Sequence, residues 1–228
     1  MQAKLSEIRK EYAAMNPEDI KLIDPCMGSG HILVYAFDVL MQIYESVGYS
    51  QRDAAKSILE HNLYGLDIDD RAYQLAYFAV MMKARQYNRR ILNGENTCHV
   101  YAIQESNSIN RAHFKFFGAG LSDLEKNTAK MQLEGLLDIL TDAKEYGSIL
   151  NVPEYNWDLL RRFVGGINDE AQVSFENAGV EQTAEELQKL IDLGETMARK
   201  YWVTCTNPPY AGTVSYTHLR AHETLSDL

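Results

Sequence analysis

The sequence feature that most constrains the fold is a seven-residue turn, Asp24-Pro25-Cys26-Met27-Gly28-Ser29-Gly30. A short apolar run at 20–23 precedes it, and a strongly apolar segment beginning near His31 follows it. Gly28 and Gly30 lack a Cβ, so the backbone can turn sharply there and a ligand can approach it closely. A helix behind the turn would offer unpaired N–H groups and the positive end of its dipole. A strand, a small-residue turn and a helix N-terminus in this order predict a nucleotide-binding loop.

Two widespread phosphate loops are excluded by the residues around these glycines. No Lys-Ser or Lys-Thr pair follows them, as a Walker A loop requires, and the Gly-Ser-Gly spacing differs from the dinucleotide fingerprint G-x-G-x-x-G. A second motif, Asn207-Pro208-Pro209-Tyr210, lies near the far end of the chain, after an apolar run at 202–205. Either motif alone would indicate little more than a turn. Both together, each at a predicted strand end, indicate one functional site.

Apolar runs alternate with amphipathic segments, which is typical of an α/β fold. Strands are predicted at 20–23, 63–66, 98–104 and 202–205, and helices at 4–15, 30–46, from 50 onward and at 71–86. The helix at 30–46 is apolar nearly all round, so we expect it to be covered on both sides. Leu75 and Ala76 are expected on the sheet-facing side of the helix at 71–86. The alternation predicts a parallel sheet with right-handed crossovers and a ligand at the carboxyl ends of its strands.

A helical insertion is predicted between the third and fourth strands. Ser122 and Glu125 have the spacing of a capping box, Pro153 is expected to open a second helix, and Thr183 to cap a third. The predicted division is an α/β part at 1–107, the insertion at 108–200, the catalytic strand and loop at 201–212, and a tail at 213–228. The tail resembles translated sequencing-adapter read-through, so we expect it to be non-native and poorly packed.

Charge and cysteine usage limit the class of protein. The net charge of −10 has the wrong sign for a free-standing DNA binder, because phosphate contacts need Lys and Arg. The three cysteines are far apart in sequence, so we expect buried small side chains in a reducing cytoplasm and no metal site: Cys26, Cys98 and Cys205. No apolar run is long enough to span a bilayer, and the first residues do not read as a signal peptide.

The two motifs together resemble the S-adenosyl-L-methionine loop and the catalytic motif of N6-adenine DNA methyltransferases. The stretches at 31–38 and 62–72 are similar to the adenine-specific methyltransferases of BREX phage-defence systems, the PglX family. This likeness covers about residues 18–108 and 196–212. It implies part of a Rossmann-like methyltransferase sheet, in an N-terminal catalytic fragment of a phage-defence or restriction-modification enzyme. Double-stranded DNA would be held by a recognition domain outside this chain, and other phage-defence proteins would be further partners.

The resemblance also implies which residues bind S-adenosyl-L-methionine. The methionyl end would lie against Asp24 and the turn that follows it, namely Pro25, Cys26, Gly28, Ser29 and Gly30. Asp67 would accept hydrogen bonds from the ribose hydroxyls, since one carboxylate can accept from two donors. Ile68 would lie against the adenine ring, and Glu105 is the candidate for a polar contact with its amino group.

The second motif suits the activation of an exocyclic amino group, whose lone pair is delocalised into its ring. The Asn207 side-chain oxygen and the Pro208 carbonyl can accept its two hydrogens, which favours a tetrahedral, nucleophilic nitrogen. Pro208 and Pro209 stiffen the loop. Tyr210 offers a ring on which an extruded base can stack, typically worth about 1–3 kcal/mol per base. Methyl transfer then depends on positioning and electrostatics, without a covalent enzyme intermediate.

Two rival functions remain open from the sequence. A glutamine-N5 protein methyltransferase could hold a carboxamide nitrogen with the same Asn-Pro-Pro-Tyr motif, although the helical insertion argues against that compact class. A cofactor-binding remnant would bind S-adenosyl-L-methionine without turnover. We expect binding without turnover for the isolated chain, because strands after the fourth and a DNA-reading domain are missing from it.

Overall fold

The computed structural model describes residue 4 and residues 15–94, 96–167 and 179–208. The described residues divide into two compact units, one of 15–102 with 201–208 and the other within 103–200. Most of the helix predicted at 4–15, and all of the tail predicted at 213–228, lie outside the described residues.

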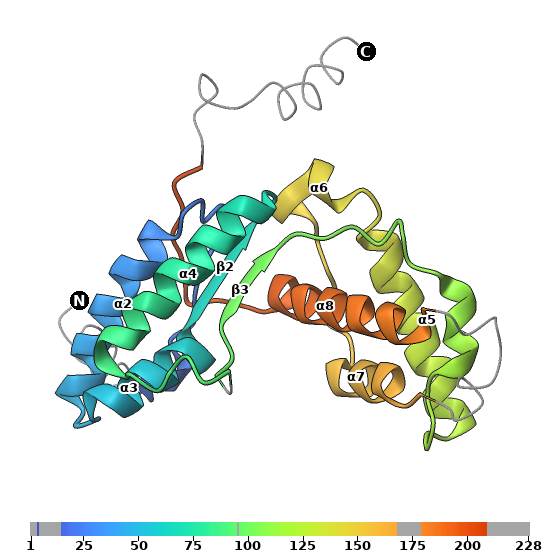
Figure 1. The fold of residues 1–228 in the computed structure, drawn as a ribbon, viewed down its shortest axis with the longest axis horizontal. Coiled ribbons are helices and arrows are strands. Elements are labelled where there is room, and N and C mark those ends of the chain that lie inside the picture. The colour runs from blue at the N-terminus through green and yellow to red at the C-terminus, as the bar shows by residue number, and fades with distance from the viewer. Residues whose placement is uncertain (1–3, 5–14, 95, 168–178, 209–228) are drawn as a thin grey trace, which may run out of the picture. The chain divides into compact units, whose positions relative to one another are not determined.

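The first unit is built on a four-stranded parallel sheet in the order β3-β2-β1-β4, of which β2 and β3 are labelled in Figure 1. Its strands are β1 (Leu22–Asp24), β2 (Leu63–Asp67), β3 (His99–Ala102) and β4 (Val203–Thr204). Leu22 is in register with Leu63 on one side and with Val203 on the other. The predicted parallel α/β sheet is therefore confirmed. Because β1 lies between β2 and β4, the carboxyl ends of these three strands are neighbours.

Three helical segments pack around this sheet. They are α2 (His31–Ser46), α3 (Gln51–Ser57), which continues into the single-turn π-helix η2 (Ile58–Asn62), and α4 (Asp70–Tyr87). Helices α2 and α4 lie side by side (Figure 1). Leu33 and Phe37 of α2 are fully buried, and each contributes about 1.5–3 kcal/mol by leaving water. The helix thereby fixes the end of the loop that precedes it.

A buried amide sets where β1 begins, two residues later than predicted. Pro17–Asp19 forms a short 3₁₀ helix, η1, and the Ile20 N–H donates to the Pro17 carbonyl instead of entering the sheet. The Asn62 side chain is fully buried and donates to the carbonyls of Pro17 (2.6 Å) and Ile20 (2.8 Å). It accepts from the Tyr44 hydroxyl at 2.8 Å, and burial raises the pKa of Tyr44 to about 12. This network holds the amino end of the sheet together.

Two predictions about helix faces are wrong. Tyr35 (73% exposed) and Val39 (41%) show that α2 has an open face, so it is not covered on both sides. On α4, Leu75 is 58% exposed, whereas Ala76, Val80 and Ala84 are buried. Apolar residues occur nearly all round both helices, so periodicity alone leaves the rotation of each helix about its axis undetermined.

The second unit is helical in its described part, as predicted. It contains η3 (Arg111–Phe116), α5 (Asp123–Ile139), α6 (Ala143–Tyr146), η4 (Gly147–Ile149), α7 (Trp157–Gly165) and α8 (Val180–Ala198). The capping box at the start of α5 is confirmed, with Ser122 and Glu125 each accepting the other's N–H. Among the apolar residues of α5, Leu133 and Leu136 are buried, but Leu124 and Met131 are exposed.

Two predicted helix starts in this unit are wrong. Helix α7 begins at Trp157 with Asn156 as its cap, so Pro153 does not open it. Helix α8 begins at Val180, directly after Gly179 with φ of 95°. Thr183 is therefore inside the helix, where its Oγ1 lies 2.9 Å from Nδ1 of the buried His113. The Thr183 hydroxyl, which the sequence predicts as a helix cap, therefore hydrogen-bonds to the buried His113 imidazole instead.

Candidate active site

Three strand ends bring the predicted site residues to one edge of the first unit's sheet. Asp24 ends β1, Asp67 ends β2, and Asn207 follows β4 by three residues. The Cys205 N–H donates to the Ile23 carbonyl at 3.0 Å, so the chain leaving β4 stays beside β1 up to this point. Residues about 180 positions apart in sequence are thereby neighbours on the same edge.

The turn after β1 is fastened across the end of β2. The Met27 side chain is buried, and its N–H donates to the Leu66 carbonyl at 3.0 Å. The Cys26 N–H donates back to Asp24 Oδ1 at 3.1 Å. Pro25 and Cys26 are half-buried, and the exposed Ser29 hydroxyl lies 3.3 Å from His31 Nδ1. The turn is a defined structure rather than a loose connection.

The two glycines of the turn meet different surroundings. Both have positive φ, 54° at Gly28 and 80° at Gly30. A Cβ on Gly30 would lie 2.9 Å from the backbone and side chain of Ala76, so α4 presses directly on the start of α2. A Cβ on Gly28 would meet nothing within 4 Å. Gly30 is therefore needed for packing, whereas Gly28 faces open space.

Asp67 joins the two loops that border this open space. Its Oδ2 accepts the Gly28 N–H at 2.9 Å, and its Oδ1 accepts the Asp69 N–H at 3.0 Å. Asp69 in turn caps α4 by accepting the Arg71 N–H at 2.8 Å, and Ile68 between them is half-buried. Each oxygen of a carboxylate can accept more than one hydrogen bond, so Asp67 keeps acceptor capacity for a ligand.

The Asp24 carboxylate is 1% exposed, and its Oδ2 has no hydrogen-bond partner among the described residues. Burial raises the pKa of this carboxyl group, against the lowering effect of hydrogen bonds from the Thr206 side chain and the Cys26 N–H. The negative charge of Asp67 raises the pKa further, and His31 lowers it slightly. A buried carboxylate with an unpaired oxygen is costly, and such a group is suited to a donor or cation supplied by a ligand.

We expect Asp24→Asn to stabilise the fold at neutral pH. A raised pKa means that the folded chain binds this proton more tightly than the unfolded chain does. The contribution of Asp24 to stability is thus most favourable below its ordinary pKa of 3.8 and falls as the pH rises through the raised pKa. The midpoint of urea unfolding should be higher for Asp24→Asn than for wild type at pH 7, and the difference should shrink at pH 4.5. An equal difference at both pH values would contradict this account.

The remaining predicted residues are placed as follows. Asn207 and Pro208 are exposed, and Pro209 and Tyr210 lie outside the described residues. Glu105 belongs to the second unit, where its Oε1 accepts the Lys144 N–H at 3.3 Å. That bond gives Glu105 a structural role at the second residue of α6.

Sequence reasoning missed two residues that shape the turn. Gly65, in the middle of β2, has no Cβ because one would lie 2.6 Å from Met27 Sδ and 2.7 Å from Leu33 Cδ1. Thr206 is the other, since its side chain hydrogen-bonds to Asp24 from the segment after β4. The signal for Gly65 was a lone glycine within an apolar strand, which often marks a close approach of another segment.

The three cysteines are less buried than predicted. Cys26 and Cys98 are half-buried and Cys205 is exposed. Cys98 packs against the core of the first unit just before β3, whereas Cys26 and Cys205 lie just beyond the ends of β1 and β4. Across the described ranges, no cluster of three or more His, Cys, Asp or Glu side chains could hold a metal ion. Nor does any helix in those ranges have the length and apolar character to cross a membrane.

Comparison with known proteins identifies similar sequences. The family model of the MmeI DNA-methyltransferase domain matches residues 2–133. The chain is 39% identical over 219 residues to the adenine-specific methyltransferase PglX of Lacticaseibacillus casei (strain Zhang), covering 93% of this chain and 17% of that protein. It is 36% identical over 228 residues to the adenine-specific methyltransferase BrxX of Escherichia coli O9:H4 (strain HS), covering 93% of this chain and 19% of that protein. The chain thus spans less than a fifth of the length of these relatives.

Proposed function

Because this chain belongs to the MmeI DNA-methyltransferase domain family, we propose that it is the cofactor-binding and catalytic part of an adenine-N6 DNA methyltransferase of phage-defence type. The observation that carries the proposal is the edge of the sheet where Asp24, Asp67 and Asn207 follow three adjacent strands. Parallel α/β sheets bind their ligands at the carboxyl ends of strands, and this is the edge at which all three residues lie.

The residues at this edge fit S-adenosyl-L-methionine, which when bound supplies a methyl group activated by a sulfonium. Asp24 has an unpaired, buried oxygen that suits the ligand's ammonium group. The turn of Pro25, Cys26, Gly28, Ser29 and Gly30 leaves open space above Gly28 for the methionyl end. Asp67 accepts ribose hydroxyls with its remaining lone pairs, and the half-buried Ile68 lies against the adenine ring. A contact of Glu105 with the adenine amino group stays a prediction.

The segment after β4 holds the target base. The Asn207 side-chain oxygen and the Pro208 carbonyl accept the two hydrogens of the adenine amino group and orient its nitrogen for attack. Pro209 keeps this segment stiff, and Tyr210 stacks on the base once it has left the duplex. Double-stranded DNA is the proposed substrate. The chain carries a net charge of −10, which does not favour contacts with DNA phosphates. We therefore assign most of the DNA-binding contacts to other parts of a longer protein.

Asn207→Ala is expected to abolish any methyl transfer to adenine while leaving cofactor affinity unchanged, because in this proposal Asn207 holds the base and makes no hydrogen bond to the cofactor. The test supplies the chain with tritiated S-adenosyl-L-methionine and an adenine-containing oligonucleotide at high concentration. The DNA is then digested to nucleosides to identify N6-methyladenine, and calorimetry measures cofactor binding.

Four outcomes separate the proposal from its rivals. Label on adenine N6 that disappears in Asn207→Ala supports an adenine methyltransferase. Label on a glutamine side chain of a protein substrate would favour the glutamine-N5 class instead. Cofactor binding without transfer to either substrate would favour the cofactor-binding remnant, and absence of cofactor binding would contradict the proposal.

A further inference from the structure

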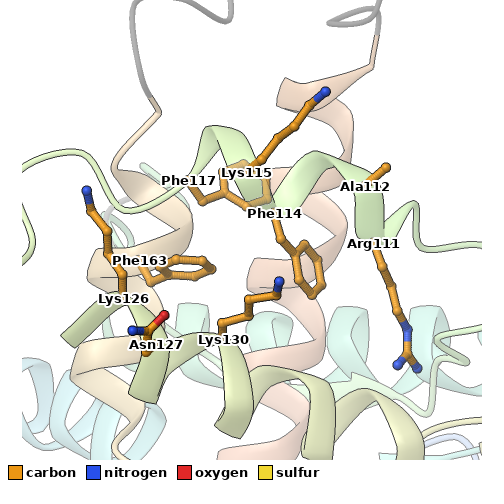
Figure 2. A pocket seen from close by; sticks show the side chains of 9 residues that line it. All are labelled: Arg111, Ala112, Phe114, Lys115, Phe117, Lys126, Asn127, Lys130 and Phe163. Atoms are coloured by element: carbon orange, nitrogen blue, oxygen red, sulfur yellow. The ribbon is translucent and has the colours of Figure 1, made fainter. Parts of the chain in front are cut away.

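The second unit contains a cavity of about 340 Å³ whose lining combines cations with aromatic rings (Figure 2). Its cations are Arg111, Lys115, Lys126 and Lys130, and no acidic residue lines it. The lining is therefore positively charged, although the chain as a whole has a net charge of −10. The volume is within the range of about 300–1,000 Å³ found for small-molecule sites.

The apolar wall of the cavity is rigid. Phe114, Phe117 and Phe163 are each at most 4% exposed, and the rings of Phe117 and Phe163 meet edge to face at 6.0 Å. Two backbone hydrogen bonds of 2.8 Å, from the Gly118 N–H to the Phe163 carbonyl and from the Ala119 N–H to the Gly166 carbonyl, fasten this wall to α7. The cavity therefore has a preformed apolar side.

The cations differ in how far their charge is already neutralised. Arg111 pairs with Asp138 at 2.6 Å, and Lys130 lies 4.0 Å from Glu134. Lys126 has no ion-pair partner within the described part of the chain, and the neighbouring Glu125 pairs with Arg162 at 3.3 Å. In Figure 2, the Lys130 amino group extends toward the middle of the cavity, whereas the amino groups of Lys126 and Lys115 point outward from its rim. Lys130 thus offers its charge inside the cavity, and Lys126, one turn earlier on α5, offers its charge at the rim.

We propose that this cavity binds a nucleotide phosphate, with the ammonium groups of Lys126 and Lys130 on the phosphate and the phenylalanine wall against the base. Lysine ammonium groups bind phosphate as compact point charges, and the Asn127 side chain in the lining adds a polar group that can hydrogen-bond to it. The phosphate belongs either to a DNA strand or to a free nucleotide. The DNA source rests on the proposed function, whereas the free-nucleotide source does not.

Fluorescence anisotropy on the whole chain tests the proposal, with three probes: a labelled single-stranded oligonucleotide directly, and dAMP or inorganic phosphate as competitors. Lys126→Glu/Lys130→Glu should weaken oligonucleotide binding by about tenfold or more, since it removes two charge-assisted contacts and adds repulsion. The matched control is Lys189→Glu, an exposed lysine of α8 in the same unit that does not line the cavity, for which less than a twofold change is expected. Lys126→Ala/Lys130→Ala should reduce the salt slope by about 0.7 per lost phosphate contact.

The outcomes distinguish the two sources. Oligonucleotide binding that depends on both lysines supports a DNA strand, and lysine-dependent binding of dAMP alone supports a free nucleotide. Equal oligonucleotide binding by wild type and Lys126→Glu/Lys130→Glu would overturn the proposal. It would also be overturned if inorganic phosphate displaced the oligonucleotide as strongly as dAMP does. Calorimetry with S-adenosyl-L-methionine on the same variants should show no change. Failure of wild type to bind that cofactor would count against the proposed function while leaving the cavity result standing.

Discussion

Asp67→Ala is expected to weaken binding of S-adenosyl-L-methionine by about 100-fold or more, the largest loss we predict at the site. In our account Asp67 accepts two ribose hydroxyls, and hydrogen bonds to a charged group are worth about 1.5–3 kcal/mol each. The same carboxylate fixes the Gly28 N–H and the Asp69 N–H, so its removal also frees both bordering loops. Calorimetric titration of the purified chain measures this loss.

Two further variants make the Asp67 experiment specific. Asp67→Asn keeps one oxygen acceptor and should have an intermediate affinity. Asp53→Asn is the matched control, because Asp53 is an exposed aspartate of the first unit, near the start of α3, that does not border the turn. If Asp67→Ala bound the cofactor within about threefold of wild type, Asp67 could not be a ribose ligand.

Gly30→Ala is expected to lower the free energy of unfolding by about 2–5 kcal/mol. An L-residue in the left-handed region costs about 1–2 kcal/mol, and Gly30 has φ of 80°. The new methyl group would also lie 2.9 Å from the Ala76 backbone, and such overpacking typically adds about 1–3 kcal/mol. Urea unfolding followed by circular dichroism measures the difference.

Gly48→Ala separates the two contributions. Gly48 has φ of 90°, comparable to that of Gly30, but a Cβ there would meet nothing within 4 Å. It should therefore cost only the conformational term of about 1–2 kcal/mol. Equal losses for the two variants would mean that α4 does not press on the start of α2 in solution.

The parts of the site that sequence reasoning predicted are those encoded by neighbouring residues. The turn at 24–30 and the acidic end of β2 follow from local composition, since glycines permit the turn and apolar runs mark the strands. The family was predicted from the same segments together with 31–38 and 62–72, and the comparisons confirm it over 93% of the chain.

The contacts that sequence reasoning missed join residues far apart in the chain. The Gly28 N–H meets Asp67 across 39 residues, and Thr183 meets His113 across 70. Propensity cannot anticipate such partners, because a hydroxyl suits a helix cap and a buried imidazole equally well. Likewise, the exposure of Leu75 depends on the rotation of α4 against the sheet, which its all-round apolar pattern leaves undetermined.

The central claim is that the cofactor and the Asn207 segment occupy one site at the carboxyl edge of the sheet. It is tested most directly by titrating the isotope-labelled chain with S-adenosylhomocysteine and following backbone amide shifts by nuclear magnetic resonance. Our account predicts that shifts concentrate at 26–30 and 67–69 and extend to 205–207. Shifts at the first two segments with none at 205–207 would contradict it.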